Sequence, residues 1–178
     1  AALFLGFATQ ATLTTVAIAQ CSLSWQPGAA AHGPQGYVNA LVRLGNGDFI
    51  AGGNFQVADN AVVNNVARFD GVAWQEMNGG ITGLVSAAVV MPNGDVVVAG
   101  YISSAGGSPV NHIARWNGSS WSQVGSGLDG YVGKLAVLPN GDLVAAGQFQ
   151  FAGGVAVAGI ARWDGSSWNA MGATGLNV

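Results

Sequence analysis

Residues 160–168 read Ile-Ala-Arg-Trp-Asp-Gly-Ser-Ser-Trp, and this stretch decides the fold because it recurs. Residues 113–121 read Ile-Ala-Arg-Trp-Asn-Gly-Ser-Ser-Trp, and residues 66–74 read Val-Ala-Arg-Phe-Asp-Gly-Val-Ala-Trp. The arginines of the three copies stand at 68, 115 and 162, so the period is 47 residues both times. A second signature, Asn-Gly-Asp, keeps this period at residues 46–48, 93–95 and 140–142. A fixed period of this length is typical of solenoids and propellers.

The middle repeat predicts four short strands. Residues 85–91, 96–100, 112–116 and 121–124 are apolar or β-rich runs, and turn residues separate them. Asn93-Gly94 predicts a tight hairpin turn in which both residues adopt positive φ. The small and polar residues 103–111 are expected to form a loop. Four antiparallel strands in one repeat form the blade of a β-propeller, and no helical periodicity competes with this interpretation.

The predicted fold class is therefore all-β, a β-propeller with about three four-stranded blades of 47-residue period. The expected blades occupy residues 37–83, 84–130 and 131–178, and a leading strand and linker precede them at residues 20–36. Trp25 in that segment resembles the fourth strand of another blade. Because propellers typically have about four to eight blades, three blades predict an incomplete ring from a longer chain. Self-association through its open apolar ends is expected.

The composition agrees with sheets that are buried on both faces. Charged residues make up 7% of the chain, against roughly 25% in ordinary soluble domains. The net charge is −3, and there are 29 glycines. The acidic balance and the lack of basic clusters argue against nucleic acid or an anionic membrane surface as a partner.

The first 19 residues predict a targeting segment. They are apolar and uncharged, and Ala17-Ile18-Ala19 is the small-x-small pattern at which signal peptidase cleaves. We expect a signal peptide that is truncated at its start, and hence a secreted, extracellular or cell-envelope protein that meets the membrane only through this segment. Two alternatives stay open: a transmembrane anchor, diluted by threonines, and lipidation at Cys21, where Gln20 occupies the position of a small residue. Cys21 is the chain's single cysteine, which excludes an internal disulfide.

Three repeated positions carry a family resemblance. A glycine ends the second strand of each repeat, an aromatic residue ends the third, and a tryptophan opens the fourth: Gly53, Gly100, Gly147; Phe69, Trp116, Trp163; Trp74, Trp121, Trp168. This pattern resembles the kelch repeat of galactose-oxidase-like propellers. It is closer to the Ala-Arg-Trp-Asp-Gly-x-x-Trp repeats of secreted bacterial propeller proteins and of fungal cortical polarity markers. The kelch double glycine survives only as Gly52-Gly53, and the aromatic-to-tryptophan spacing is shorter than in kelch units. The resemblance implies the fold and leaves the function open, because propellers have many functions.

The residues that recur at the period are expected to be structural. They are Arg68, Arg115, Arg162, Trp74, Trp121, Trp168, Asp48, Asp95 and Asp142. If strands two and three of a repeat pair, each arginine lies within reach of the aspartate of its own repeat. We therefore expect three equivalent ion pairs, since a partly buried arginine needs a partner.

No motif predicts a catalytic residue, a metal or a cofactor. Asp164-Gly165 resembles the Asp-box of sialidase propellers only superficially, because that motif separates its aspartate from its glycine, and a hairpin turn explains the pair. His32 and His112 do not cluster with other metal-ligating residues. Serine, histidine and aspartate do not occur in a recognisable catalytic arrangement. We therefore do not expect an enzyme.

Candidate binding residues come from positions that break the repeat. The segments after strands two and four of each repeat are expected to share one face, and their polar residues differ between repeats. Those residues are Asn54, Asn64, Asn65, Tyr101, Asn111, His112 and Gln148. A lectin with one identical site per blade would repeat its polar residues there. The sequence thus predicts a non-catalytic binding or interaction module for a protein or glycan ligand. The alternative is a carbohydrate-binding or carbohydrate-active propeller whose active residues lie partly outside this chain.

Overall fold

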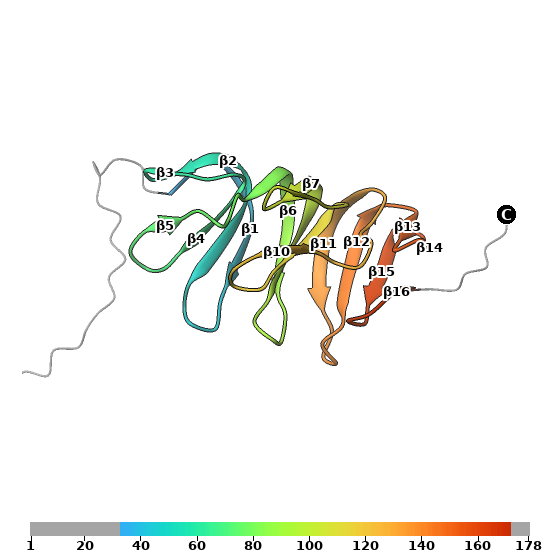
Figure 1. Cartoon of the computed structure of the whole chain (residues 1–178). Helices are drawn as coiled ribbons and strands as arrows, with labels where there is room; N and C mark the ends of the chain where they lie inside the picture. The colour runs from blue at the N-terminus through green and yellow to red at the C-terminus, as the bar shows by residue number, and fades with distance from the viewer. Residues whose placement is uncertain (1–32, 172–178) are drawn as a thin grey trace, which may run out of the picture. The chain divides into compact units, whose positions relative to one another are not determined.

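The computed structural model describes residues 33–171, and its regular structure consists of β-strands (Figure 1). Each repeat forms one antiparallel sheet, so the predicted all-β fold with blades of propeller type is confirmed. The expected signal peptide, the Trp25 strand, Cys21 and His32 lie outside the described residues, as do residues 172–178. Within residues 33–171, no helix is long and apolar enough to cross a membrane.

The strands of each sheet follow one another in chain order. The first sheet contains β1 (Pro34–Arg43), β2 (Phe49–Ala58), β4 (Val66–Phe69) and β5 (Trp74–Gln75), with β3 (Ala61–Val62) paired to β2. The second contains β6 (Ile81–Val90), β7 (Val96–Ala105), β9 (Ile113–Trp116) and β10 (Trp121–Gln123), with β8 (Ser108–Pro109) paired to β7. The third contains β11 (Tyr131–Val137), β12 (Leu143–Gln148), β15 (Ile160–Trp163) and β16 (Trp168–Ala170). A separate hairpin of β13 (Phe151–Ala152) and β14 (Val155–Ala156) accompanies the third sheet.

The prediction of a loop at residues 103–111 is wrong in part. Strand β7 continues to Ala105 and pairs with β8, so this segment extends the sheet as a narrow hairpin. Gly106 and Gly107 close its tip with φ of 58° and 78°, values that glycine adopts at little cost. The first strands also begin earlier than the expected blade boundaries at 37 and 84, because the long second strands provide partners as far as Pro34 and Ile81.

The Asn-Gly turns lie where they were predicted, but their geometry differs. Among the residues of the middle turn, only Gly94 has positive φ, at 88°. Met91 and Asp95 pair across a three-residue loop: the Met91 N–H donates to the Asp95 carbonyl at 2.8 Å, and the Gly94 N–H donates to the Met91 carbonyl at 2.9 Å. Pro92 favours this longer loop, because its fixed φ suits the first central position of an ordinary type I turn. The asparagine therefore needs no left-handed conformation.

A repeated bulge explains the repeated glycine at the end of strand two. The register of each first strand shifts at the same position, and the residues at the shift are Asn39, Ser86 and Gly133. Opposite the middle bulge, a Cβ on Gly100 would lie 2.1 Å from the Leu84 carbonyl oxygen. The corresponding distances are 1.9 Å at Gly53 and 2.1 Å at Gly147. Only glycine lets the two backbones approach this closely.

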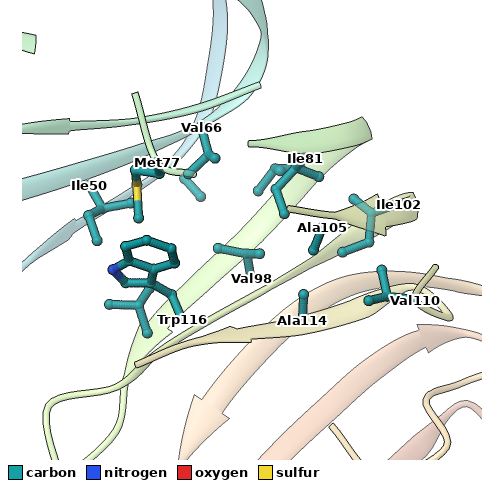
Figure 2. Close-up of a cluster of buried hydrophobic side chains, with 13 residues drawn as sticks. Ile50, Val66, Met77, Ile81, Val98, Ile102, Ala105, Val110, Ala114 and Trp116 are labelled. Atoms are coloured by element: carbon teal, nitrogen blue, oxygen red, sulfur yellow. The ribbon is translucent and has the colours of Figure 1, made fainter. Parts of the chain in front are cut away.

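The sheets bury their faces against one another. One apolar cluster joins the first and second sheets, where Ile50 and Met77 lie close to Trp116 and Val98 (Figure 2). A second cluster joins the second and third sheets through Val97, Val132 and Leu143, among others. Each sheet therefore depends on its neighbour for the burial of a whole face.

The repeated tryptophans bind successive repeats together. The Trp121 indole N–H donates to the Met77 carbonyl of the preceding repeat at 2.7 Å. One period later, the Trp168 indole N–H donates to the Val124 carbonyl at 3.2 Å. The ring is an apolar surface for the sheet contact, and its polar edge satisfies a backbone carbonyl of the connecting segment.

The three predicted arginine–aspartate ion pairs are confirmed. Nitrogen-to-oxygen distances are 2.7 Å for Arg68–Asp48, 3.4 Å for Arg115–Asp95 and 3.1 Å for Arg162–Asp142. In each repeat, the side-chain amide of the preceding asparagine also donates to the same aspartate oxygen, Oδ2, at 2.8–2.9 Å. The aspartates are largely buried, and the arginines are more exposed. The Asn-Gly-Asp signature therefore forms a turn and a counter-ion at once.

The ion pairs should stabilise the sheets unequally. We expect a double-mutant cycle of Arg68→Met and Asp48→Asn to give a coupling free energy of about 0.5–1 kcal/mol, near the upper limit for exposed pairs. The cycle of Arg115→Met and Asp95→Asn should give less, because that pair is longer and its arginine is half exposed. Urea unfolding at low and high salt measures both couplings, and salt should weaken them. Zero coupling in both cycles would contradict a stabilising role.

Two glycines of the same hairpin should respond differently to alanine. Gly100→Ala should cost more than about 3 kcal/mol of unfolding free energy, because its Cβ meets rigid backbone. Gly94→Ala should cost only about 1–2 kcal/mol, the penalty of a left-handed alanine, since nothing lies within 4 Å of its Cβ. Gly94→Asn should restore part of that loss. Urea midpoints of the three variants test this order, and equal losses for both alanines would disprove it.

Candidate functional site

The connections after β2, β7 and β12 and those after β5 and β10 lie at one end of the sheets, which we call the loop end. The registers require this, because each second strand ends where the first strand of its sheet begins. Backbone hydrogen bonds also join the connections of successive repeats: Gly106 N–H donates to the Gly80 carbonyl, and Gly153 N–H donates to the Gly127 carbonyl. The Asn-Gly-Asp turns lie at the opposite end, the turn end. The expected shared face is therefore confirmed.

Three of the asparagines predicted as candidate binding residues stabilise the loop end itself. Asn65 is buried, its Oδ1 accepts a hydrogen bond from the Phe55 N–H at 3.1 Å, and its amide donates to the Ile81 carbonyl at 3.0 Å. The amides of Asn64 and Asn111 donate to the Gly79 and Ser126 carbonyls at 3.4 Å and 2.9 Å. The polar groups used in these bonds are not available to a ligand.

Asn54, Tyr101 and Gln148 belong to residue pairs that contain a tyrosine and join the first two strands of each sheet. The paired residues are Tyr37 and Asn54, Leu84 and Tyr101, and Tyr131 and Gln148. The rings of Tyr101 and Tyr131 stack with centroids 4.8 Å apart and planes 26° apart, although they belong to different repeats. Tyr37 and Tyr101 are 77% and 56% exposed. The sequence prediction omitted Tyr37 and Tyr131, which the strand register would have revealed as the partners of Asn54 and Gln148.

His112 stands at a backbone position that other repeats fill with more tolerant residues. Its φ is 62°, and the equivalent residues Asn65 and Gly159 have φ of 58° and 73°. A left-handed conformation costs a residue with a side chain roughly 1–2 kcal/mol relative to glycine. The imidazole lies edge-on to Tyr101 at 6.0 Å between ring centroids, and its buried Nδ1 has no hydrogen-bond partner within residues 33–171. Such strain and an unpaired polar atom are often found together at functional sites.

Two cavities of the described residues lie beside the tyrosines and His112. The central hollow, about 490 Å³, lies at the first strands of the three sheets and is lined by Asn39, Leu84, Ser86, Tyr131, Gly133 and Lys134. The junction cleft, about 350 Å³, lies between the second and third repeats and is lined by Asn111, His112, Ser126, Gly127, Leu128, Asp129, Phe151, Gly153 and Gly154. Tyr101 contacts Tyr131 of the hollow on one side and His112 of the cleft on the other. We call the two cavities and the tyrosines between them the loop-end surface.

Asp129 contributes a charged carboxylate to the junction cleft. Its Oδ1 accepts hydrogen bonds from the Phe151 and Gln150 N–H groups, both at 2.8 Å. The bond from Phe151 is the main reason why the pKa of Asp129 lies below its ordinary value. The side chain is exposed and therefore ionised near neutral pH.

The turn end offers less to a ligand. A groove of about 320 Å³ there is lined by Arg115, Asp95, Asp142 and Asp164, among others. These four side chains all take part in the ion pairs or in turns. Among the residues that the structure describes, no group of three or more His, Cys, Asp and Glu side chains could hold a metal ion.

Asp164 serves as a turn residue. Its Oδ1 accepts the Ser166 and Ser167 N–H groups at 2.9 Å and 2.8 Å. Asn117 does the same in the middle repeat, where its Oδ1 accepts from Ser119 and Ser120 at 3.0 Å and 2.9 Å. The bond from Ser167, followed by that from Ser166, holds the pKa of Asp164 well below its ordinary value. This geometry supports the hairpin interpretation over an Asp-box.

Comparison with known proteins adds a finding about the fold. Residues 92–120 match a family model described as a domain of unknown function (DUF5122) beta-propeller. The match spans the Asn-Gly turn and strands β7, β8 and β9 of the middle repeat, and it does not confirm the kelch-like or galactose-oxidase-like type. No curated protein and no solved structure matches the chain.

The Asp164 turn should respond to acid. Because the pKa of the folded state is depressed, the stabilisation by this carboxylate is present above the ordinary pKa of 3.8 and is lost as pH falls towards the folded pKa. We expect the Ser166 and Ser167 amide resonances to move in acid with a midpoint below that ordinary value. Asp164→Asn should keep the turn, as Asn117 does, and abolish the titration of these amides. A midpoint at or above the ordinary value would contradict the hydrogen-bonded turn.

Proposed function

We propose that this chain is a non-catalytic binding module of a β-propeller protein, that it acts outside the cell or in the cell envelope, and that its ligand binds at the loop-end surface. The ligand is a protein or a glycan. The proposed location rests on the apolar segment at residues 1–19 with its Ala-Ile-Ala pattern.

The stacked tyrosine pair is the observation that carries this proposal. Tyr101 stands where the other repeats have Asn54 and Gln148, and Tyr131 stands where they have Tyr37 and Leu84, so the fold does not require a tyrosine at either position. Exposed tyrosine is typical of binding surfaces, because it provides a large and rigid contact area with a polar tip. Here Tyr101 is exposed and Tyr131 is half-buried, and their stacked rings lie between two cavities that also contain polar groups.

Charge on the same surface adds to its chemistry. Lys134 is the chain's single lysine, and it lines the central hollow where the equivalent residues are Ala40 and Ala87. Asp129 lies in the junction cleft. The loop-end surface thus combines aromatic rings with one cation and one carboxylate, whereas the arginines at 68, 115 and 162 serve the repeat itself.

A swap between repeats tests the proposal. We expect the 178-residue chain to bind at least one member of a panel of immobilised glycans and peptides in an interferometry assay. The double variant Tyr101→Asn and Tyr131→Leu carries the residues that the first and second repeats have at these positions. It should lose that binding by about tenfold or more, because it keeps the fold and removes the stacked rings.

The control is Val72→Ala at the turn end, where the side chain is exposed and far along the chain from the tyrosines. This variant should bind like the wild type. Unchanged binding by the double variant would disprove the assigned surface. Hydrolysis or oxidation of panel glycans by the purified chain would instead favour the carbohydrate-active alternative.

A further inference from the structure

We infer that the junction cleft binds a neutral saccharide through His112, Asp129 and Phe151. This inference rests on the proposed binding function and assigns a ligand class to one of its two cavities. It depends on a comparison of two junctions: the one between the first and second repeats and the one between the second and third. Their residues correspond to one another because the repeat has a fixed period.

The junction between the first and second repeats is satisfied internally. Asn65 stands at the His112 position, and both of its polar atoms bond the backbone. Thr82 stands at the Asp129 position, and its Oγ1 accepts the Ser104 hydroxyl at 2.7 Å. Ser104 itself occupies the position of Phe151. This junction therefore presents neither the aromatic ring nor the free polar groups that the second junction presents.

At the second junction, the Nε2 atom of His112 remains available to a ligand. Its Nδ1 is buried without a partner among the described residues. A buried N–H without an acceptor is rarer than an unpaired acceptor, so we assign the proton to Nε2. No hydrogen bond joins Nε2 to residues 33–171, and the residue is half-buried at the cleft wall. Nε2–H can therefore donate into the cleft.

Acceptors and a hydroxyl line the same cleft as this donor. Asp129 uses Oδ1 for two backbone N–H groups, which leaves Oδ2 to accept from a ligand. Asn111, an exposed residue, uses its amide nitrogen for the Ser126 carbonyl, which leaves its own oxygen to accept from a ligand. The Ser126 hydroxyl can both donate and accept. Phe151, 46% exposed, adds an apolar surface to the same wall.

This combination of a donor, several acceptors and an apolar surface fits a hydroxylated ring better than an ion. An anion would face the Asp129 carboxylate without a lysine or arginine in the lining. A quaternary ammonium ion would leave the His112 donor unpaired, because it offers no acceptor. A pyranose offers hydroxyls that donate and accept, and its C–H face can pack on Phe151. The cleft volume of about 350 Å³ lies at the small end of the range for ligand pockets, about 300–1,000 Å³.

Amide chemical shifts of the 178-residue chain test the ligand class. The probes are methyl α-D-glucopyranoside, mannopyranoside and galactopyranoside, with sodium glucuronate and tetramethylammonium chloride for the charged classes. At millimolar concentration, we expect at least one neutral pyranoside to shift the amides of Asn111, Asp129 and Phe151. The equivalent amides of the first junction, those of Asn64, Thr82 and Ser104, should not move.

Variants then separate ligand binding from folding. His112→Asn should weaken binding about tenfold and leave the urea midpoint unchanged or raised, because asparagine tolerates the left-handed backbone and can make the two bonds of Asn65. Asp129→Asn keeps the Oδ1 acceptor for the loop and should also weaken binding about tenfold. Phe151→Ala should weaken it, whereas Val155→Ala should not, since Val155 is 40% exposed on the same hairpin and does not line the cleft.

Each contrary result has a distinct meaning. If no neutral pyranoside moves the cleft amides while a peptide or charged probe binds the loop-end surface, the saccharide assignment is wrong and the binding function stands. If pyranosides bind His112→Asn and Asp129→Asn as tightly as the wild type, the cleft is not their site. If no panel member of any class binds the chain, the proposed function fails together with this inference.

Discussion

The structure depends on burial of both faces of a sheet against neighbouring sheets. A single four-stranded sheet of this size cannot shield both of its apolar faces from water. Successive repeats therefore pack face to face, and two apolar clusters form between them. This constraint explains the low charge of the chain. It also explains where the charges of the repeat lie: the arginine–aspartate pairs stand beside the turns, where the arginine ends stay hydrated and the aspartates gain partners.

The same constraint gives the repeated residues their separate roles. The buried indole N–H of each tryptophan needs an acceptor, and the connecting carbonyls of Met77 and Val124, which also accept a turn N–H, provide it for the next repeat. The bulge in each first strand brings a carbonyl so close to the second strand that only glycine fits. Tryptophan and glycine are therefore repeated for two different physical reasons, one concerning contact between sheets and one concerning contact within a sheet.

The sequence was sufficient for the repeat, the order of strands and the Arg–Asp pairs, because each of these depends on spacing within one period. It did not predict the continuation of β7 to Ala105, since polar residues on an exposed hairpin look like a loop. It misjudged the Asn-Gly turn type: the same three-residue loop forms around Pro92 and, in the first repeat, around Gly45. The Tyr101–Tyr131 stack joins two repeats through three-dimensional packing, and no single-repeat pattern contains that information. Asn65 was predicted as a candidate ligand residue, but its side chain completes the backbone hydrogen bonds of its own loop.

These differences indicate where function lies in a repeat protein. Residues that obey the period are explained by burial, turns and ion pairs, so they carry no information about a ligand. Residues that break it need another reason, and His112 is the clearest case because it is less suited to its backbone position than asparagine or glycine. Its Nδ1 has no hydrogen-bond partner among residues 33–171, whereas Asn65 at the equivalent position has both side-chain polar atoms paired and is a residue type that tolerates the left-handed conformation better. A residue with such costs and no structural benefit is a reason to look for a ligand, and this is the physical basis of the proposal for the junction cleft.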